Sequence, residues 1–476
     1  MGTSDVPARP AAGPHSRLGG FLSTYWTRGT PGRTTPRSLV VFMHRMWLLA
    51  FVLKLIGASW DVSWHFKWLR DDLAPPHLIN TVGTGIAVGL VLAHSFTGYG
   101  TDRRSLRIIQ VGTGIFVLAG PIDIINHRLN GLDLTAWSPS HMLLYIGTGI
   151  MLAGVLRSWW HNYPRDTDGD ISRSTGRPSR GWTAGFVAMW ALMFENTFFP
   201  TGQQEYGILE VASWFRGQPY GEGELLNFAA EQIGRPVDDI AIEHFSLPIA
   251  PWVYPVWGVA VCAAVLVFAR LSTGWRWTAT AVVAGYVAYR CVIWPLLTFT
   301  IFPPSSVPFW LLPVGLAVDL VLLLRINPYL RAVLGAVVVT AVAWGALAVN
   351  SLALGTPLAL GSWDIAQMRA AFEAGDTLHF PPVSWSSWWL AGLGLTVTWV
   401  AVTWIWQRST GDRPPPAASY AAEPPRDARG ILLGEPLDEP DARPARRAAA
   451  TGERPVAGPS SRAGRRSRRA RERAHA

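Results

Sequence analysis

Carboxylate and imidazole side chains recur in this sequence at spacings that suit metal binding. The candidates form two sets, each an Asp-x-x-x-His pair followed by a second histidine: Asp61, His65 and His77, and Asp123, His127 and His141. Residues four apart lie on one face of a helix, so each Asp–His pair can address a common ion. Two imidazoles and one carboxylate are a ligand set for copper, iron or zinc, with positions left open for water or substrate.

The two sets belong to a longer internal repeat. The second histidine of each set stands six residues ahead of a Gly-Thr-Gly-Ile tetrapeptide, at 83–86 and at 147–150, and just after a proline. Proline favours the first turn of a helix, so His77 and His141 should each lie where a helix begins. Small residues also suit close helix packing, which alone could explain the tetrapeptide. We expect the first four helices to be two copies of one helical pair.

The composition indicates that membrane helices position these residues. Of 476 residues, 49% are hydrophobic and 15% are charged, whereas soluble proteins carry about 25% charged residues. Apolar runs of about 20 residues, enough to cross a bilayer core of about 30 Å, occur about ten times. They lack the alternation of a membrane barrel, so helices are expected. The expected spans are 39–59, 77–97, 105–125, 140–159, 181–199, 249–271, 277–299, 308–325, 329–352 and 384–406.

Loop charges orient this all-α polytopic integral membrane protein. Arginine gathers in the N-terminal segment, in alternate loops and in the C-terminal tail, which places both termini in the cytoplasm. The net charge of +9 is therefore a topology signal and does not indicate nucleic-acid binding. Both ligand sets then face the extracytoplasmic side of the plasma membrane. The expected parts are a disordered Arg-rich segment 1–38, a duplicated four-helix metal-binding region 39–160, a six-helix region 161–406 with an outer loop 200–247, and a disordered basic tail 407–476.

Further polar residues stand within the expected spans. We interpret Arg290 and Asp319 as a buried ion pair near mid-membrane, because an unpaired charge there is costly. His44, Arg45 and Lys54 give the first span a polar stripe, which favours a face turned towards protein. At the outer end of the fifth span, Glu195 is interpreted as a residue of the wet interface, with a place in the metal rim as the alternative.

The first ligand set resembles a known family. The run Asp61-x-Ser63-Trp64-His65, followed by Arg70-Asp71 and Pro75-x-His77, is similar to a signature of the C subunit of particulate methane and ammonia monooxygenases. The resemblance covers about residues 55–150. It implies copper at Asp61, His65 and His77. The set at 123–141 occupies the place of the family's second cluster, although it begins with Asp where the family has Asn. The resemblance also implies that the protein works in a complex with other subunits and with an electron donor.

Three functions follow as hypotheses. The leading one is a copper-binding membrane protein related to that C subunit, which oxidises a small apolar substrate with dioxygen, alone or as a subunit of the enzyme. The second is a metal-handling or structural membrane protein without turnover. The third is a metal-dependent lipid hydrolase, whose nucleophile would be a metal-bound water. A catalytic serine or a third histidine in the cluster would favour the hydrolase, and the sequence offers no obvious one.

Overall fold

The structure is a computed structural model that describes residues 32–33, 35–68, 74–130, 135–162, 180–354, 364–375 and 385–410. Within its helices, the side chains of 127–130, 354, 385–386 and 410 lie outside this description. The described residues form helices and no strands, which confirms the all-α prediction for this part of the chain. Of the expected disordered segments 1–38 and 407–476, residues 37–38 lie in the helix Arg37–His65 and residues 407–410 in the helix Trp385–Thr410, whereas 1–31, 34 and 411–476 lie outside the described residues.

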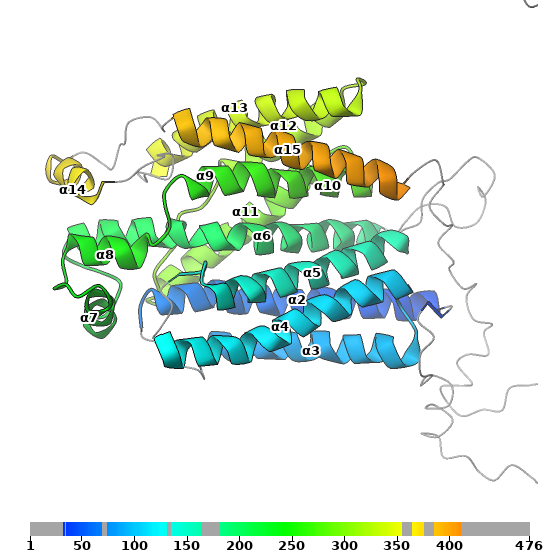
Figure 1. The fold of residues 1–476 in the computed structure, drawn as a ribbon, viewed down its shortest axis with the longest axis horizontal. Coiled ribbons are helices and arrows are strands. Elements are labelled where there is room, and N and C mark those ends of the chain that lie inside the picture. Colours follow the sequence, from blue (N-terminus) through cyan, green and yellow to red (C-terminus); the bar gives the residue numbers. More distant parts are fainter. Residues whose placement is uncertain are drawn as a thin grey trace, which may run out of the picture. The chain divides into compact units, whose positions relative to one another are not determined.

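The elements follow in chain order, and Figure 1 labels them. They are α2 Arg37–His65, α3 Pro75–Thr97, α4 Arg103–Asn130, α5 Pro139–His161, α6 Arg180–Phe215, α7 Gly223–Gln232, α8 Asp239–Ser246, α9 Val253–Trp257, the π-helical η1 Gly258–Cys262, α10 Ala263–Thr273, α11 Thr278–Phe299, α12 Leu311–Leu322, α13 Pro328–Leu354, α14 Ile365–Glu373 and α15 Trp385–Thr410.

Eight stretches of the described residues are long and apolar enough to cross a bilayer: α2, α3, α4, α5, the run from α9 to α10, α11, α13 and α15. Each coincides with an expected span, so the chain is a multi-pass helical membrane protein. The other two expected spans fall on α6 and α12. The first is a 36-residue helix that carries three glutamates, and the second has 12 residues, about 18 Å of helix. The count of ten stays a prediction.

Two helical hairpins hold the predicted ligands, α2 with α3 and α4 with α5, and they lie side by side in Figure 1. A glycine makes each close approach possible. A Cβ at Gly83 would lie 2.6 Å from the carbonyl oxygen of Ala50, and one at Gly147 would lie 2.7 Å from the nitrogen of Phe116. The second glycine of the first tetrapeptide, Gly85, meets open space. The packing role predicted for the tetrapeptide therefore belongs to its first glycine.

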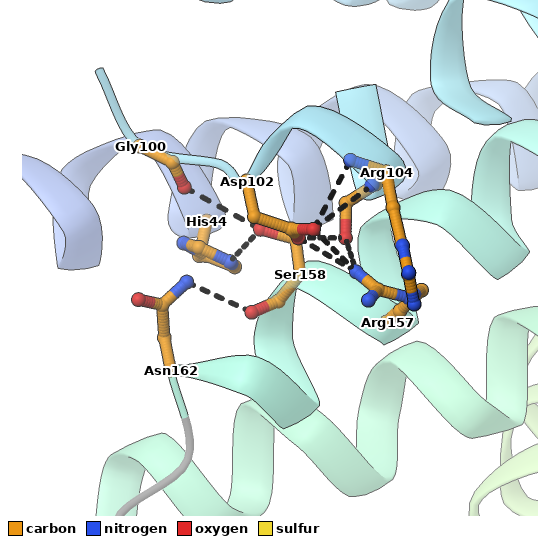
Figure 2. Close-up of polar contacts among 8 residues, drawn as sticks. His44, Gly100, Asp102, Arg104, Arg157, Ser158 and Asn162 are labelled. Carbon is orange, nitrogen blue, oxygen red and sulfur yellow. Dashed lines mark hydrogen bonds and ion pairs between the residues drawn. The ribbon is translucent and has the colours of Figure 1, made fainter. Parts of the chain in front are cut away.

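A polar network joins the hairpins at the end of α2 opposite the ligands (Figure 2). Ser158 of α5 lies 3.4 Å from Nε2 of His44, and its hydroxyl donates to the carbonyl of Gly100 at 3.4 Å. Next to it, Nη1 of Arg157 lies 2.7 Å from Asp102. Burial alone would raise the pKa of Asp102, but hydrogen bonds from Ser105 and the guanidinium of Arg157 outweigh it and lower the pKa.

The buried charges are paired differently from the prediction. Arg290 and Asp319 do not form an ion pair with each other. Nη2 of Arg290 lies 2.6 Å from Glu205 of α6, whereas Asp319 lies 3.5 Å from Arg270. Asp319 also accepts hydrogen bonds from the backbone nitrogen of Thr280 at 2.8 Å and from its hydroxyl at 2.7 Å. Each charge is therefore satisfied by a separate partner, as the cost of burial requires.

The polar stripe of α2 is confirmed at two of its three positions. The side chains of His44 and Lys54 are buried, at 2% and 6% exposure. Arg45 is exposed, so the prediction that it turns towards protein is wrong. Arg45 directly follows His44, and neighbouring residues of a helix point about 100° apart, so both could not face the same partner.

The region predicted as an outer loop, 200–247, is largely helical. Helix α6 continues through it to Phe215, and α7 and α8 follow. It contacts the end of α2: the indole of Trp68 donates to Glu222, and the backbone nitrogen of Glu222 donates to the carbonyl of Lys67 at 2.9 Å. In Figure 1, α7 and α8 gather at this end of the bundle. Burial raises the pKa of Glu210, which accepts from two backbone nitrogens here, to about 7.

Candidate metal centre

The first ligand set comes together where α2 ends and α3 begins. Nε2 of His77 lies 2.7 Å from Oδ1 of Asp61, and Nε2 of His65 lies 3.4 Å from the same oxygen. One ligand atom from each of the three residues lies within 4.8 Å of the others. The side chains are partly buried, with exposures between 24% and 36%. The three residues predicted from the sequence therefore converge on one point.

This geometry fits a single metal ion. Ligand atoms bonded at about 2.0–2.2 Å to one ion lie about 3–4 Å from one another. The contact between Asp61 and His65 is within that range, while the contact between Asp61 and His77 is slightly shorter. Oδ1 of Asp61 is buried and accepts no hydrogen bond of proper geometry from the described residues. An ion between the three side chains would satisfy that oxygen with a small outward shift of His77.

The Asp-x-Ser-Trp-His run of α2 divides its residues between two faces. Asp61 and His65 face the ligand cluster. Ser63 is fully buried and donates a hydrogen bond of 2.6 Å to the carbonyl of Pro303. The ring of Trp64 packs against Phe302, with centroids 5.6 Å apart. The serine and the tryptophan thus fix the rotation of α2, and this rotation directs the carboxylate and the imidazole to the metal side.

The second histidine of each set lies in the first turn of its helix, as the sequence predicts. Pro75 and Pro76 open α3, so His77 is its third residue. Pro139 opens α5, so His141 is again the third residue, and the hydroxyl of Ser138 caps this helix by accepting from the nitrogen of His141. Proline suits these positions because the first helical N–H groups have no partner within the helix.

The second ligand set is only partly brought together by the described residues. Nε2 of His141 lies 3.6 Å from Oδ1 of Asp123. Nδ1 of His141 lies 2.9 Å from the carbonyl of Thr135, a contact that directs Nε2 towards Asp123. Helix α4 includes His127, but its side chain lies outside the described residues. Within those residues, three-ligand convergence is found for the first set alone.

Five of the six candidate ligands, all but His127, line one cavity of about 670 Å³. Three carboxylates contribute to its wall, since Glu195 of α6 joins Asp61 and Asp123. Tyr145 also lines it, near enough to interact electrostatically with all three. Glu195 is 9% exposed, so the alternative of a rim position describes it better than a wet interface does. Tyr145 carries no signal in the sequence, because an aromatic residue in an apolar span reads as ordinary core.

A lysine provides the positive charge in the cavity wall. Nζ of Lys54 donates to Oδ1 of Asn80 at 3.0 Å and to the hydroxyl of Thr84 at 3.2 Å. It also lies 3.6 Å from the ring centroid of Phe116. Two oxygens and one aromatic face thus surround the ammonium group. The cation is held in place by both hairpins, because Phe116 belongs to α4.

Fold and site together define a multi-pass helical membrane protein with a candidate Asp/His/His metal centre. No protein-family model matches the chain, and no curated protein or solved structure shows significant similarity to it.

Proposed function

We propose that this chain is a copper-binding membrane protein related to the C subunit of particulate methane and ammonia monooxygenases. The observation that carries the proposal is the convergence of Asp61, His65 and His77, whose ligand atoms lie within 4.8 Å of one another. Two imidazoles and one carboxylate suit copper, with iron and zinc as chemically acceptable alternatives. The residues quoted for the resemblance include these same three ligands.

The cavity supports an oxidative role. Copper held at this site would bind and activate dioxygen. The carboxylate of Asp61 would offset part of the ion's charge, and the imidazoles of His65 and His77 would hold it in position. Apolar side chains such as Leu144 and Phe199 line much of the remaining wall, so a small apolar substrate is the expected guest. Electrons would come from a partner subunit or another donor.

The second set extends the proposal. We assign Asp123, His127 and His141 to a second copper position, produced by duplication of one helical pair. The equal place of His77 and His141 in their helices supports the duplication. The arginine distribution supports ten spans, cytoplasmic termini and a plasma-membrane protein with extracytoplasmic metal sites.

Metal analysis of the purified protein tests the proposal. Copper should co-purify with the chain or bind on titration, and His65→Ala and His127→Ala should each lower the copper content. His244→Ala is the matched control, because His244 is exposed on α8 and does not line the cavity. Copper content that is zero, or equal in all variants, would refute the proposal.

Oxygen dependence then separates the alternatives. An oxidase function requires a product that forms only with dioxygen and is lost in His65→Ala. A metal-handling protein would hold copper without such a product, and a lipid hydrolase would hold zinc and cleave lipid under anaerobic conditions. No serine is among the described residues that line the cavity, so the hydrolase gains no support from the structure.

A further inference from the structure

A second cavity opens between α2, α6 and α11, on the other side of the metal cavity's wall. It has a volume of about 690 Å³. Its lining is mostly apolar and small, with Val52, Val187, Ala188 and Gly285 among the residues, and Arg180 and Glu195 are its charged members. Two of these three helices are membrane spans. We call this cavity the α2–α6–α11 groove.

The groove and the metal cavity share part of their lining. Leu55, Leu192 and Glu195 line both. The two spaces are therefore separated there by a wall one side chain thick. Leu192 and Glu195 are three residues apart on α6, so they lie on the same face of that helix. Leu55 contributes to the wall from α2.

Glu195 is an unusual component of that wall. It is 9% exposed, and no described residue donates a hydrogen bond to it. Neither of its oxygens is among the fully enclosed, unpartnered atoms of the described residues, so the carboxyl borders the open space of the two cavities that it lines. Its carboxyl stands where a molecule moving from the groove would enter the metal cavity.

The charges on either side restrict what can pass. In the metal cavity the carboxylates of Asp61 and Asp123 outnumber the one cation of the described lining, Lys54, so an anion meets a net negative wall. A cation would have to leave water to enter the mostly apolar groove, and the guanidinium of Arg180 in its lining also repels it. An uncharged apolar molecule meets neither barrier. The small side chains of Ala188 and Gly285 leave room for it.

We propose that the α2–α6–α11 groove binds small, uncharged, apolar molecules from the bilayer and admits them to the metal cavity through the wall of Leu55, Leu192 and Glu195. What happens to the molecule at the metal rests on the proposed function above. The route itself does not, because it is a property of the groove and the wall without any ion.

A thiol placed in the metal cavity reports on this route in metal-free protein. Leu144→Cys supplies it, in a Cys291→Ser background that removes the exposed native thiol; Cys262 is buried. The protein is held in lipid nanodiscs and treated with N-ethylmaleimide, which is uncharged and dissolves in bilayers, or with a sulfonated maleimide that stays in water. Labelling rates are measured by mass spectrometry.

Filling the groove should slow the uncharged reagent alone. We expect Ala188→Trp to reduce labelling by N-ethylmaleimide about tenfold and to leave the sulfonated reagent unaffected. Ala401→Trp is the matched control, on an exposed face of α15 away from both cavities. Leu192→Ala, which thins the wall, should accelerate N-ethylmaleimide severalfold.

The proposal is overturned if Ala188→Trp leaves the N-ethylmaleimide rate unchanged, or slows both reagents equally, since equal slowing indicates a damaged cavity. It is also overturned if Leu192→Ala brings no acceleration. A chain that binds no copper but shows the expected rates would refute the proposed function and retain the route.

Discussion

The two ligand sets share their residue types but differ in their surroundings. In the first, Asp61 lies 2.7 Å from His77 and its side chain is 32% exposed. In the second, Asp123 lies 3.6 Å from His141 and its side chain is 12% exposed. His141 is held by the carbonyl of Thr135, in a loop whose Ala136 nitrogen donates to Gln203 of α6. The aspartate of the first set is thus more exposed than that of the second set, which lies beside a loop that is bonded to α6.

The cavity wall differs between the copies as well. The alignment that pairs Asp61 with Asp123 also pairs Lys54 with Phe116. These two residues contact each other, with the ammonium 3.6 Å from the ring centroid. One copy therefore supplies a cation and the other the aromatic face that receives it. Among the described residues, ligand candidates from both halves of the repeat thus face one cavity in unequal electrostatic environments.

Removal of a first-set ligand should have the largest effect. His77→Ala deletes one of three converging ligands, so copper affinity at the first position should fall by more than about 100-fold, the upper range for changes outside the ligand sphere. Isothermal titration of the detergent-solubilised protein measures it. A loss below tenfold would mean that His77 is not a ligand.

Removal of a second-set ligand should have a smaller effect on copper affinity at the first position. His141→Ala should remove the second copper and leave affinity at the first position within about threefold, because separate ligands hold each ion. Copper stoichiometry by mass spectrometry of the metal checks this. Loss of both ions in His141→Ala would instead show that the two ligand sets form one shared site and do not bind separate ions.

The positive charge of Lys54 should lower the copper affinity of the first position modestly. Lys54 and Asp61 are seven residues apart on α2, about 10 Å along the axis, and a unit charge at that distance is worth about 1–2 kcal/mol at an effective dielectric constant of about 20. Lys54→Met should therefore raise copper affinity by about 5- to 30-fold, whereas Lys54→Arg should leave it nearly unchanged. Equal affinity in both variants would exclude this electrostatic role.

The smallest effect is expected at the opposite end of the hairpins. The pKa of Asp102 lies below its ordinary value of 3.8, so its pairing with Arg157 stabilises the fold above that pH and is lost as pH falls through the lowered pKa. Asp102→Asn should lower the melting temperature by a few degrees at neutral pH, with the difference from wild type vanishing in acid. Copper binding should be unchanged, in contrast to both ligand sets.

Sequence patterns predict the helical fold and the residues of the first site, but they do not predict the whole cavity. Apolar runs predict the helices because lipid leaves few alternatives, and the spacing of Asp61, His65 and His77 predicts convergence because helical geometry is regular. The partners of Arg290 and Asp319 were missed, since pairing across distant helices depends on packing that no local pattern encodes. Tyr145 was missed because an aromatic residue in an apolar span cannot be told from an ordinary core residue. Glu195 is marked by its charge, but its place between two cavities comes only from the arrangement of α2, α6 and α11.

In the proposed copper centre, Asp61, His65 and His77 bind one ion together. X-ray absorption at the copper edge, on protein loaded with one copper per chain, tests it most directly. We expect two imidazole nitrogens and at least one oxygen at about 2.0 Å from the copper, with one imidazole contribution lost in His77→Ala. A spectrum without imidazole scattering, or one unchanged in His77→Ala, would contradict it.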